Sequence, residues 1–157
     1  MSDQGLFHYT QSGLDNVWLA NGWRREETDY GSAFAIDHAD ELHRAIAAAI
    51  VRNHDPLRGQ EARFLRTILG LSQDQFAKLL GLDRATVIRW EKARSKPLAR
   101  TYDIAARTSY EARSDGDSLV LRIIKEMQDA DEKEHGPHYR RVFETENEGW
   151  RERKEAA

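Results

Sequence analysis

Side chains that could bind a nucleic acid gather between positions 84 and 89. Arg84 and Arg89 can each donate two parallel hydrogen bonds to O6 and N7 of a guanine, and Thr86 can donate, accept or contact a thymine methyl group. Free backbone N–H groups at a helix start attract phosphate, which suits Ser72 and Gln73 as well as Arg84. Basic residues alone are more often a solvated surface, so the surrounding pattern has to decide between these alternatives.

No set of residues typical of catalysis or metal binding stands out. Cysteine is absent, which excludes thiolate metal sites and a cysteine nucleophile. His135 and His138 flank a glycine and a proline but lack the further ligands that a metal site needs. Asp15, Asp37 and Asp40 are typical of turns and helix caps. The chain also lacks a phosphate-binding glycine loop and the Gly-x-Ser-x-Gly and His-Glu-x-x-His motifs. We therefore expect no enzyme and no bound metal or cofactor.

Charge is unevenly distributed along the 157-residue chain. The formal net charge of −3 by itself argues mildly against a nucleic acid partner. Residues 1–56 hold 4 basic and 9 acidic residues, residues 57–100 hold 10 and 4, and residues 101–157 hold 10 and 14. The segments therefore carry −5, +6 and −4, and a basic central segment is typical of a phosphate-binding surface. The polar run Asn53-His54-Asp55-Pro56 is interpreted as a linker.

The basic segment is predicted to contain three consecutive short helices. Apolar residues at helical spacing indicate the first helix over residues 60–70. Ser72 caps the second helix, and Gln75 three residues later completes a capping box. Asp83 caps the third helix, which we expect over residues 84–92.

The second and third of these helices are predicted to form a helix-turn-helix unit. Each has about two turns, and Gly81 permits a sharp turn between them. Ala77 is small where the two helices approach, so they can cross closely. One helix would then cross the DNA backbone while the other enters the major groove. The inward side of the third helix carries Val87 and Glu91. Its outward side is formed by Arg84, Ala85, Thr86 and Arg89.

A longer pattern surrounds this unit over residues 60–97. It is carried by Leu65, Arg66, Leu71, Ser72, Gln73, Phe76, Ala77, Leu80, Gly81, Leu82, Asp83, Thr86, Val87, Arg89, Trp90 and Glu91. The pattern resembles the Xre/Cro-type, or lambda-repressor-like, DNA-binding domain. The resemblance implies that Gln73 contacts DNA near the start of the second helix. It assigns base contacts to Arg84, Ala85, Thr86 and Arg89. It assigns positions near phosphates to Lys92, Arg94 and Lys96. That family usually has glycine where this chain has Ala93, so we expect a third helix that runs longer.

Short strands are predicted in the N-terminal segment. Asn21-Gly22 is the strongest short-range signal for a β-hairpin, so residues 17–19 are expected to pair with residues 23–28. A second turn leads to a strand over residues 33–36. The following helix is expected to reach about Arg52. A sheet this small is weak alone, so it should pack on a helix or on a partner.

Two stretches of this segment carry a second resemblance. They are Ser12-Gly13-Leu14-Asp15-Asn16-Val17-Trp18-Leu19-Ala20-Asn21-Gly22 and Leu42-His43-Arg44-Ala45-Ile46. They resemble the N-terminal part of MqsA-like (YgiT-type) antitoxins, which pair a zinc-binding N-terminal domain with a C-terminal helix-turn-helix. The zinc ligands of that family are cysteines, and Glu27-Thr28-Asp29-Tyr30-Gly31 stands here where a Cys-x-x-Cys-Gly turn is expected. We therefore expect the strand scaffold without zinc.

Further elements are predicted after the helix-turn-helix. Pro97 can open a helix over residues 98–112, and residues 119–131 form another. The latter has too many apolar residues for one half-exposed stripe. The surplus packs either within the chain or against a second copy, and the sequence leaves both alternatives open. Residues 139–143 could form a strand, with Trp150 as an anchor.

These patterns predict an α+β, mostly α protein with three parts. Residues 1–56 form an N-terminal strand-and-helix dimerisation or partner domain, residues 57–113 a helix-turn-helix DNA-binding domain, and residues 114–157 a C-terminal helix with a charged tail. We expect a transcriptional repressor that binds double-stranded DNA at an inverted-repeat operator as a homodimer. The alternative is an antitoxin that binds a toxin protein and autoregulates its operon. No signal peptide or membrane span is apparent, so a cytoplasmic protein is expected.

Overall fold

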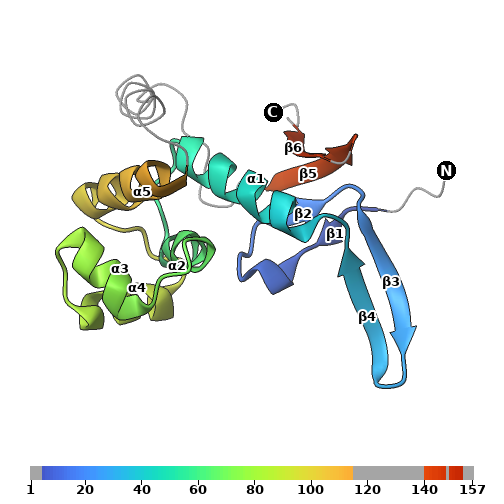
Figure 1. The fold of residues 1–157 in the computed structure, drawn as a ribbon, viewed down its shortest axis with the longest axis horizontal. Helices are drawn as coiled ribbons and strands as arrows, with labels where there is room; N and C mark the ends of the chain where they lie inside the picture. Colours follow the sequence, from blue (N-terminus) through green and yellow to red (C-terminus); the bar gives the residue numbers. More distant parts are fainter. Residues whose placement is uncertain (1–4, 115–139, 148, 154–157) are drawn as a thin grey trace. The chain divides into compact units, whose positions relative to one another are not determined.

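The structure is a computed structural model that describes residues 5–114, 140–147 and 149–153 (Figure 1). Contacts divide the chain into two units, one of residues 1–46 with 139–157 and one of residues 47–138. Among the described residues, no helix is long and apolar enough to cross a membrane. The predicted helix over residues 119–131 and the histidines His135 and His138 lie outside the described residues.

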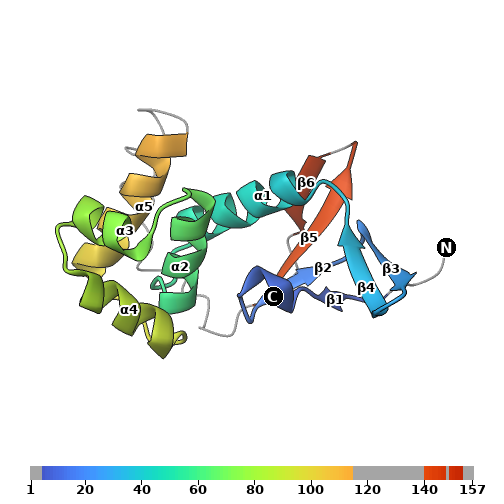
Figure 2. The same ribbon diagram turned by 60° about the horizontal axis from the view of Figure 1, so that its bottom comes forward.

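The second unit is helical. It contains α2 (Gly59–Ile68), α3 (Gln73–Leu80), α4 (Arg84–Ala93) and α5 (Arg100–Ser114), and Figure 2 shows them packed together. Helix α1 (Ala39–Arg52) leads into this unit from the first one. The three short helices predicted for the basic segment are thus confirmed as α2, α3 and α4. Their buried apolar side chains include Ala62, Phe64, Leu65, Phe76, Ala77 and Val87.

The start of α5 differs from the prediction. The sequence predicted a helix that opens at Pro97 and covers residues 98–112, whereas α5 begins at Arg100. The reason is that this stretch pairs with the chain before α2. Leu98 donates its backbone N–H to the carbonyl oxygen of Leu57 at 2.8 Å, and Pro97 forms an antiparallel bridge with Arg58. Leu98 is consequently buried before the helix starts.

The first unit contains a four-stranded sheet built from both ends of the chain. Its strand order is β1 (Phe7–His8), β2 (Val17–Leu19), β5 (Arg141–Glu146) and β6 (Gly149–Arg153). A short 3₁₀ helix, η1 (Thr10–Ser12), connects β1 with β2. Strands β2 and β5 run parallel, and the other neighbours run antiparallel. The strand expected over residues 139–143 is therefore present from Arg141. It joins the N-terminal strands, although the sequence analysis assigned it to a charged tail.

The hairpin predicted at Asn21-Gly22 is wrong. Both edges of β2 are occupied, by β1 and by β5, so the chain after β2 cannot return along it. The Asn21 side chain accepts the backbone N–H of Thr145 at 2.8 Å and thereby extends the contact with β5. Gly22 has a positive φ of 74°, and the ring of Trp150 covers the place where a side chain would stand. The predicted anchor role of Trp150 is thus confirmed.

The remaining strands form a separate hairpin. Strands β3 (Trp23–Thr28) and β4 (Gly31–Ile36) pair antiparallel from Trp23 opposite Ile36 to Thr28 opposite Gly31. The second predicted turn is therefore confirmed, with Asp29 and Tyr30 at its tip, but β4 begins at Gly31, two residues before the predicted strand. Together with the helices and the four-stranded sheet, this hairpin confirms the α+β, mostly α class.

Candidate nucleic-acid interface

Helix α3 begins and ends as its sequence predicts. The Ser72 hydroxyl accepts the backbone N–H of Gln75 at 3.1 Å, and the Gln75 side chain accepts the backbone N–H of Ser72 at 2.8 Å. This reciprocal pair is the predicted capping box. At the other end, Gly81 has a φ of 71°, a left-handed conformation that glycine adopts without steric cost. Helix α3 is thereby confined to eight residues.

Helix α4 follows after Gly81, Leu82 and Asp83. The Asp83 carboxylate accepts both the backbone N–H of Thr86, at 2.9 Å, and its hydroxyl, at 2.5 Å. These hydrogen bonds from Thr86 hold the pKa of the Asp83 carboxyl below its usual range, so the cap stays ionised. Because the Thr86 hydroxyl donates to the cap, its methyl group and the acceptor lone pairs of its oxygen remain for other contacts.

Apolar packing fixes the approach of α3 and α4. Phe76 and Ala77 of α3 and Val87 of α4 are each 1% exposed, so both helices bury apolar side chains on their inner sides. Ala77 is buried as expected, and a larger side chain there would push the helices apart. The short turn and this packing determine which side of α4 is buried against α3 and which side faces solvent.

A partly buried polar cluster links α2, α3 and α4. Glu91 accepts Arg66 Nε at 2.6 Å through Oε1, and Arg66 Nη2 at 3.1 Å through Oε2. Gln73 Nε2 donates to the same Oε2 at 2.8 Å, and Arg66 Nη1 donates to the carbonyl oxygen of Leu71 at 2.8 Å. We call Arg66, Glu91 and Gln73 the α2–α3–α4 cluster. It positions Gln73 at the start of α3 relative to α4.

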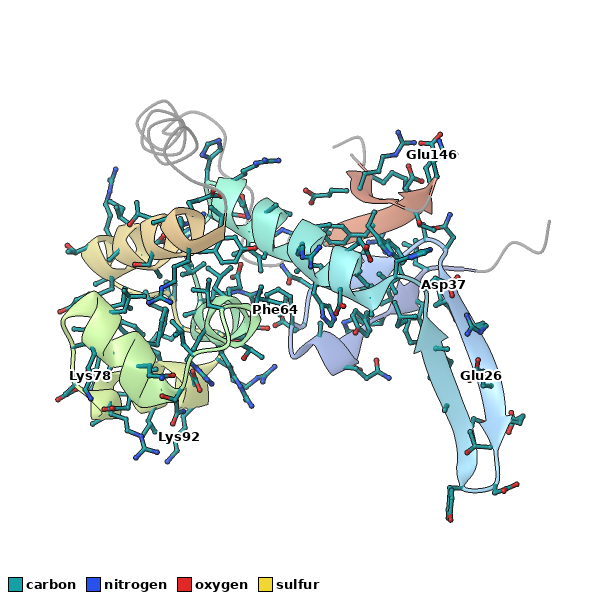
Figure 3. The ribbon with its side chains drawn as sticks, in the orientation of Figure 1. Glu26, Asp37, Phe64, Lys78, Lys92 and Glu146 are labelled. Carbon is teal, nitrogen blue, oxygen red and sulfur yellow. The ribbon has the colours of Figure 1, made fainter. Side chains whose placement is uncertain are left out.

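The outer side of α4 presents basic side chains to solvent. Arg84, Ala85, Arg89 and Lys92 are all exposed. Figure 3 shows Lys92 pointing away from the helices of its unit. The structure therefore brings the predicted base-reading residues together on one helix. Ser72 is exposed and Gln73 half-buried at the start of α3.

Ile88 is a residue of this surface that the sequence analysis missed. It is half-buried and lies four residues after Arg84 and four before Lys92, so the three share one face of α4. A partly exposed apolar side chain between basic ones is suited to contact a thymine methyl group. The signal was available, since helical spacing alone places Ile88 on the outer side.

The end of α4 is tied to the start of α2. Helix α4 runs through Ala93, as expected, and Arg94 adopts a positive φ of 48°. The backbone N–H of Gln60 donates to the carbonyl oxygen of Arg94 at 2.9 Å, and that of Gly59 to Lys96 at 3.2 Å. The side chains of Arg94 and Lys96 are exposed. Backbone hydrogen bonds to the start of α2 thus hold the loop after α4, which carries the predicted phosphate-binding residues Arg94 and Lys96.

Replacing Gly59 by alanine is expected to lower the free energy of unfolding by roughly 1–3 kcal/mol. A Cβ atom at Gly59 would overlap the backbone carbonyl oxygen of Trp90, which cannot swing aside as a side chain could. Urea denaturation measures the change. Gly149→Ala is the control, since its Cβ would stay 3.7 Å from the nearest atom, the Glu146 carbonyl oxygen. Equal urea midpoints for Gly59→Ala and wild type would contradict the predicted close contact.

The comparisons with known proteins agree with this geometry. Residues 63–108 match the helix-turn-helix family model, a range that runs from within α2 into α5 and covers less than half of the chain. The match supports the interpretation that the protein is a DNA-binding transcription regulator. No curated protein and no solved structure matches the chain. Within the described residues, no group of three His, Asp or Glu side chains could hold a metal ion.

Proposed function

We propose that the protein is a transcriptional repressor that binds an inverted-repeat operator as a homodimer. The observation that carries this proposal is the exposed basic side of α4, which follows a short turn after α3 and is backed by the α2–α3–α4 cluster. Such a helix can enter the major groove while the preceding one crosses the backbone. No catalytic step is part of the proposal.

Each group of exposed residues has a distinct task in this proposal. Arg84 and Arg89 donate paired hydrogen bonds to guanine, and Ala85 and Ile88 contact thymine methyl groups. The N–H groups at the start of α3, beside Ser72 and Gln73, bind a phosphate. Further phosphates are bound by Lys92, Arg94 and Lys96. Phosphate contacts hold the protein in register on the duplex, and base contacts select the sequence.

Arg84→Ala and Arg89→Ala are each expected to lower the affinity for the operator by roughly 5- to 150-fold, with much less effect on unrelated DNA. The operator is first selected from fragments of the organism's genomic DNA, and fluorescence anisotropy then measures affinity. Lys96→Ala is expected to weaken both kinds of DNA alike and to flatten the salt dependence, because it loses only a phosphate contact.

The control for these variants is Arg113→Ala, which removes an exposed arginine from the last turn of α5. It should leave operator affinity within about twofold of wild type, a change well below the loss of one base contact. Wild-type affinity and selectivity in both Arg84→Ala and Arg89→Ala would show that the outer side of α4 does not read DNA.

The second candidate function is an antitoxin that binds a toxin protein and autoregulates its operon. The observation that favours it is an aromatic cluster in the first unit, in which the ring centroids of Phe7 and Trp23 lie 4.8 Å apart and Phe34 is 43% exposed. Tyr9, a further aromatic residue that could form such a patch, is buried. Co-purification with the product of a neighbouring toxin-sized gene would favour this candidate.

A further inference from the structure

The β3–β4 hairpin is an unusual element of the first unit. It extends away from the four-stranded sheet of the same unit, and most of its side chains are exposed (Figure 1). Each strand has six residues, and within the described part of the chain no third strand pairs with either of them. An isolated two-stranded hairpin is marginally stable in water at best. Each of its two edges therefore has backbone groups available for pairing with another strand.

The two edges of the hairpin differ sharply in charge. Strand β3 carries Arg24, Arg25, Glu26 and Glu27. Strand β4 reads Gly-Ser-Ala-Phe-Ala-Ile and carries no charge and no proline. Charged side chains on an edge strand oppose pairing with further strands, whereas an uncharged edge permits it. Among the described strands of five or more residues, β4 alone is uncharged.

On one face of the hairpin, Phe34 of β4 belongs to an aromatic cluster, and Arg25 of β3 stands directly opposite it. The ring of Phe34 lies 4.8 Å from that of Phe7 and 6.2 Å from that of Trp23, measured between centroids. Phe34 nevertheless remains 43% exposed. A strand added beside β4 would cover the exposed ring of Phe34 on the side away from Arg25.

We propose that β4 pairs antiparallel with β4 of a second copy of the chain, so that two hairpins form one four-stranded sheet across a two-fold axis. Facing residues of an antiparallel pair share one face, so a two-fold axis must pass through a facing pair of identical residues. Centring it on Phe34 brings the two exposed rings together. It also places Ala33 opposite Ala35 and Ser32 opposite Ile36.

The charges of the two strands explain why a second copy of the chain is the expected partner of β4. The neutral β4 strand faces another neutral strand, so no charge is opposed across the junction. The charged β3 strands then form both outer edges of the four-stranded sheet, which stops the assembly at two copies. The inference rests on the proposed function in one respect, since it identifies the interface of the homodimer proposed above.

Disulfide trapping tests the pairing directly. The chain has no cysteine, so a single introduced thiol can be followed without background. Facing residues of an antiparallel pair have Cα atoms about 4.5–5.5 Å apart, within the range that a disulfide spans. Phe34→Cys is therefore expected to form a covalent dimer on mild oxidation. Glu26→Cys, on the charged strand β3, is the matched control and should stay monomeric on a non-reducing gel. Equal cross-linking of both variants would overturn the proposal.

A charge introduced at the β4 edge tests the interface without a covalent bond. By sedimentation equilibrium, Ala33→Lys should raise the dimer dissociation constant at least about tenfold, since it places two lysines in the neutral junction. Tyr30→Lys adds the same charge at the hairpin tip, where Tyr30 is fully exposed, and should leave the constant within about twofold. Unchanged circular dichroism shows that both variants fold. A monomeric wild type, or a dimer that Ala33→Lys leaves intact, would overturn the proposal.

These outcomes are separable from a failure of the proposed function. If substitutions in β4 leave the dimer dissociation constant unchanged while Arg84→Ala still weakens operator binding, the proposed interface is wrong and the repressor proposal stands. If the Phe34→Cys variant cross-links two copies but no operator is selected, the interface stands and the repressor proposal fails. Cross-linking of the Phe34→Cys variant only to a different protein would overturn pairing with a second copy.

Discussion

Replacing Arg107 by leucine is expected to lower the free energy of unfolding by about 3–5 kcal/mol. Arg107 lies in α5 and is 1% exposed. Its Nε atom donates to Oδ1 of Asp103, one turn earlier on the same helix and itself 4% exposed. Leucine would fill part of the volume but leave a buried carboxylate without its cation. Urea denaturation followed by far-UV circular dichroism measures the loss.

The same guanidinium also holds the end of α1 and the chain that follows. Its Nη1 and Nη2 atoms donate, over 2.5–3.1 Å, to the carbonyl oxygens of Ile50, Val51, Asn53 and Asp55. Carbonyl groups in the last turn of a helix have no partner within that helix, so an external donor stabilises them. Asp103 Oδ2 in turn accepts the backbone N–H of Leu57 at 2.7 Å. One ion pair thus fixes the path from α1 to α2.

Two variants test whether this fixed path depends on geometry or on charge alone. Arg107→Lys keeps the charge but loses the planar fork of donors, so its stability should fall between those of wild type and Arg107→Leu. Arg113→Leu removes an exposed arginine from the same helix and should change stability by no more than about 0.5 kcal/mol. Arg107→Leu with the wild-type urea midpoint would contradict the assigned role.

Local signals predicted the helix-turn-helix because its structure depends on near neighbours. Ser72 and Gln75 are three residues apart, and Asp83 caps the residue three positions on. Gly81 adopts the left-handed conformation that its position after a helix suggests. These hydrogen bonds form within one helical turn, so residue types and spacing are sufficient to predict them.

The N-terminal strands show where local signals fail. Asn21-Gly22 favours a hairpin when the two flanking strands are free to pair. Here Thr145, 124 residues further along the chain, hydrogen-bonds the Asn21 side chain, and β5 occupies the edge of β2. Periodicity within a segment contains no information on such a partner. The same limit applies to Arg107. In the sequence, Asp103 and Arg107 resemble an ordinary exposed ion pair at four-residue spacing, and nothing there indicates that the pair is buried.

Glu91→Gln is expected to lower the free energy of unfolding by about 3 kcal/mol and to weaken operator binding roughly tenfold. The side chains of Glu91 and Arg66 are 8% and 14% exposed, so the largely buried cation of Arg66 would lose its anionic partner. The glutamine amide has only one acceptor oxygen and an NH2 group in place of the other, so Arg66 and Gln73 could no longer both donate to residue 91 as they do to Glu91. Urea denaturation and fluorescence anisotropy with the selected operator measure the two effects.

Whether Glu91→Gln lowers or raises the affinity for DNA distinguishes a positioning role of Glu91 from a purely electrostatic effect of its charge. Removing a negative charge beside a DNA-binding surface should by itself raise the affinity for DNA. A fall in affinity therefore indicates that the cluster holds α3 and α4 in place. Asp74→Asn is the control, since it removes the same charge from α3 but breaks only an exposed ion pair with Lys78. It should leave stability nearly unchanged and affinity equal to or above wild type.

A double variant separates the stabilising role of the cluster from its positioning role. Arg66→Met combined with Glu91→Leu replaces the buried ion pair by apolar side chains, which restores much of the stability lost on removing one partner. With leucine at position 91, Gln73 has no acceptor there, so operator affinity should remain low although the protein is stable. Recovery of wild-type affinity together with stability would contradict the positioning role, because correct packing of α2 and α4 would then suffice to place the start of α3 for DNA binding.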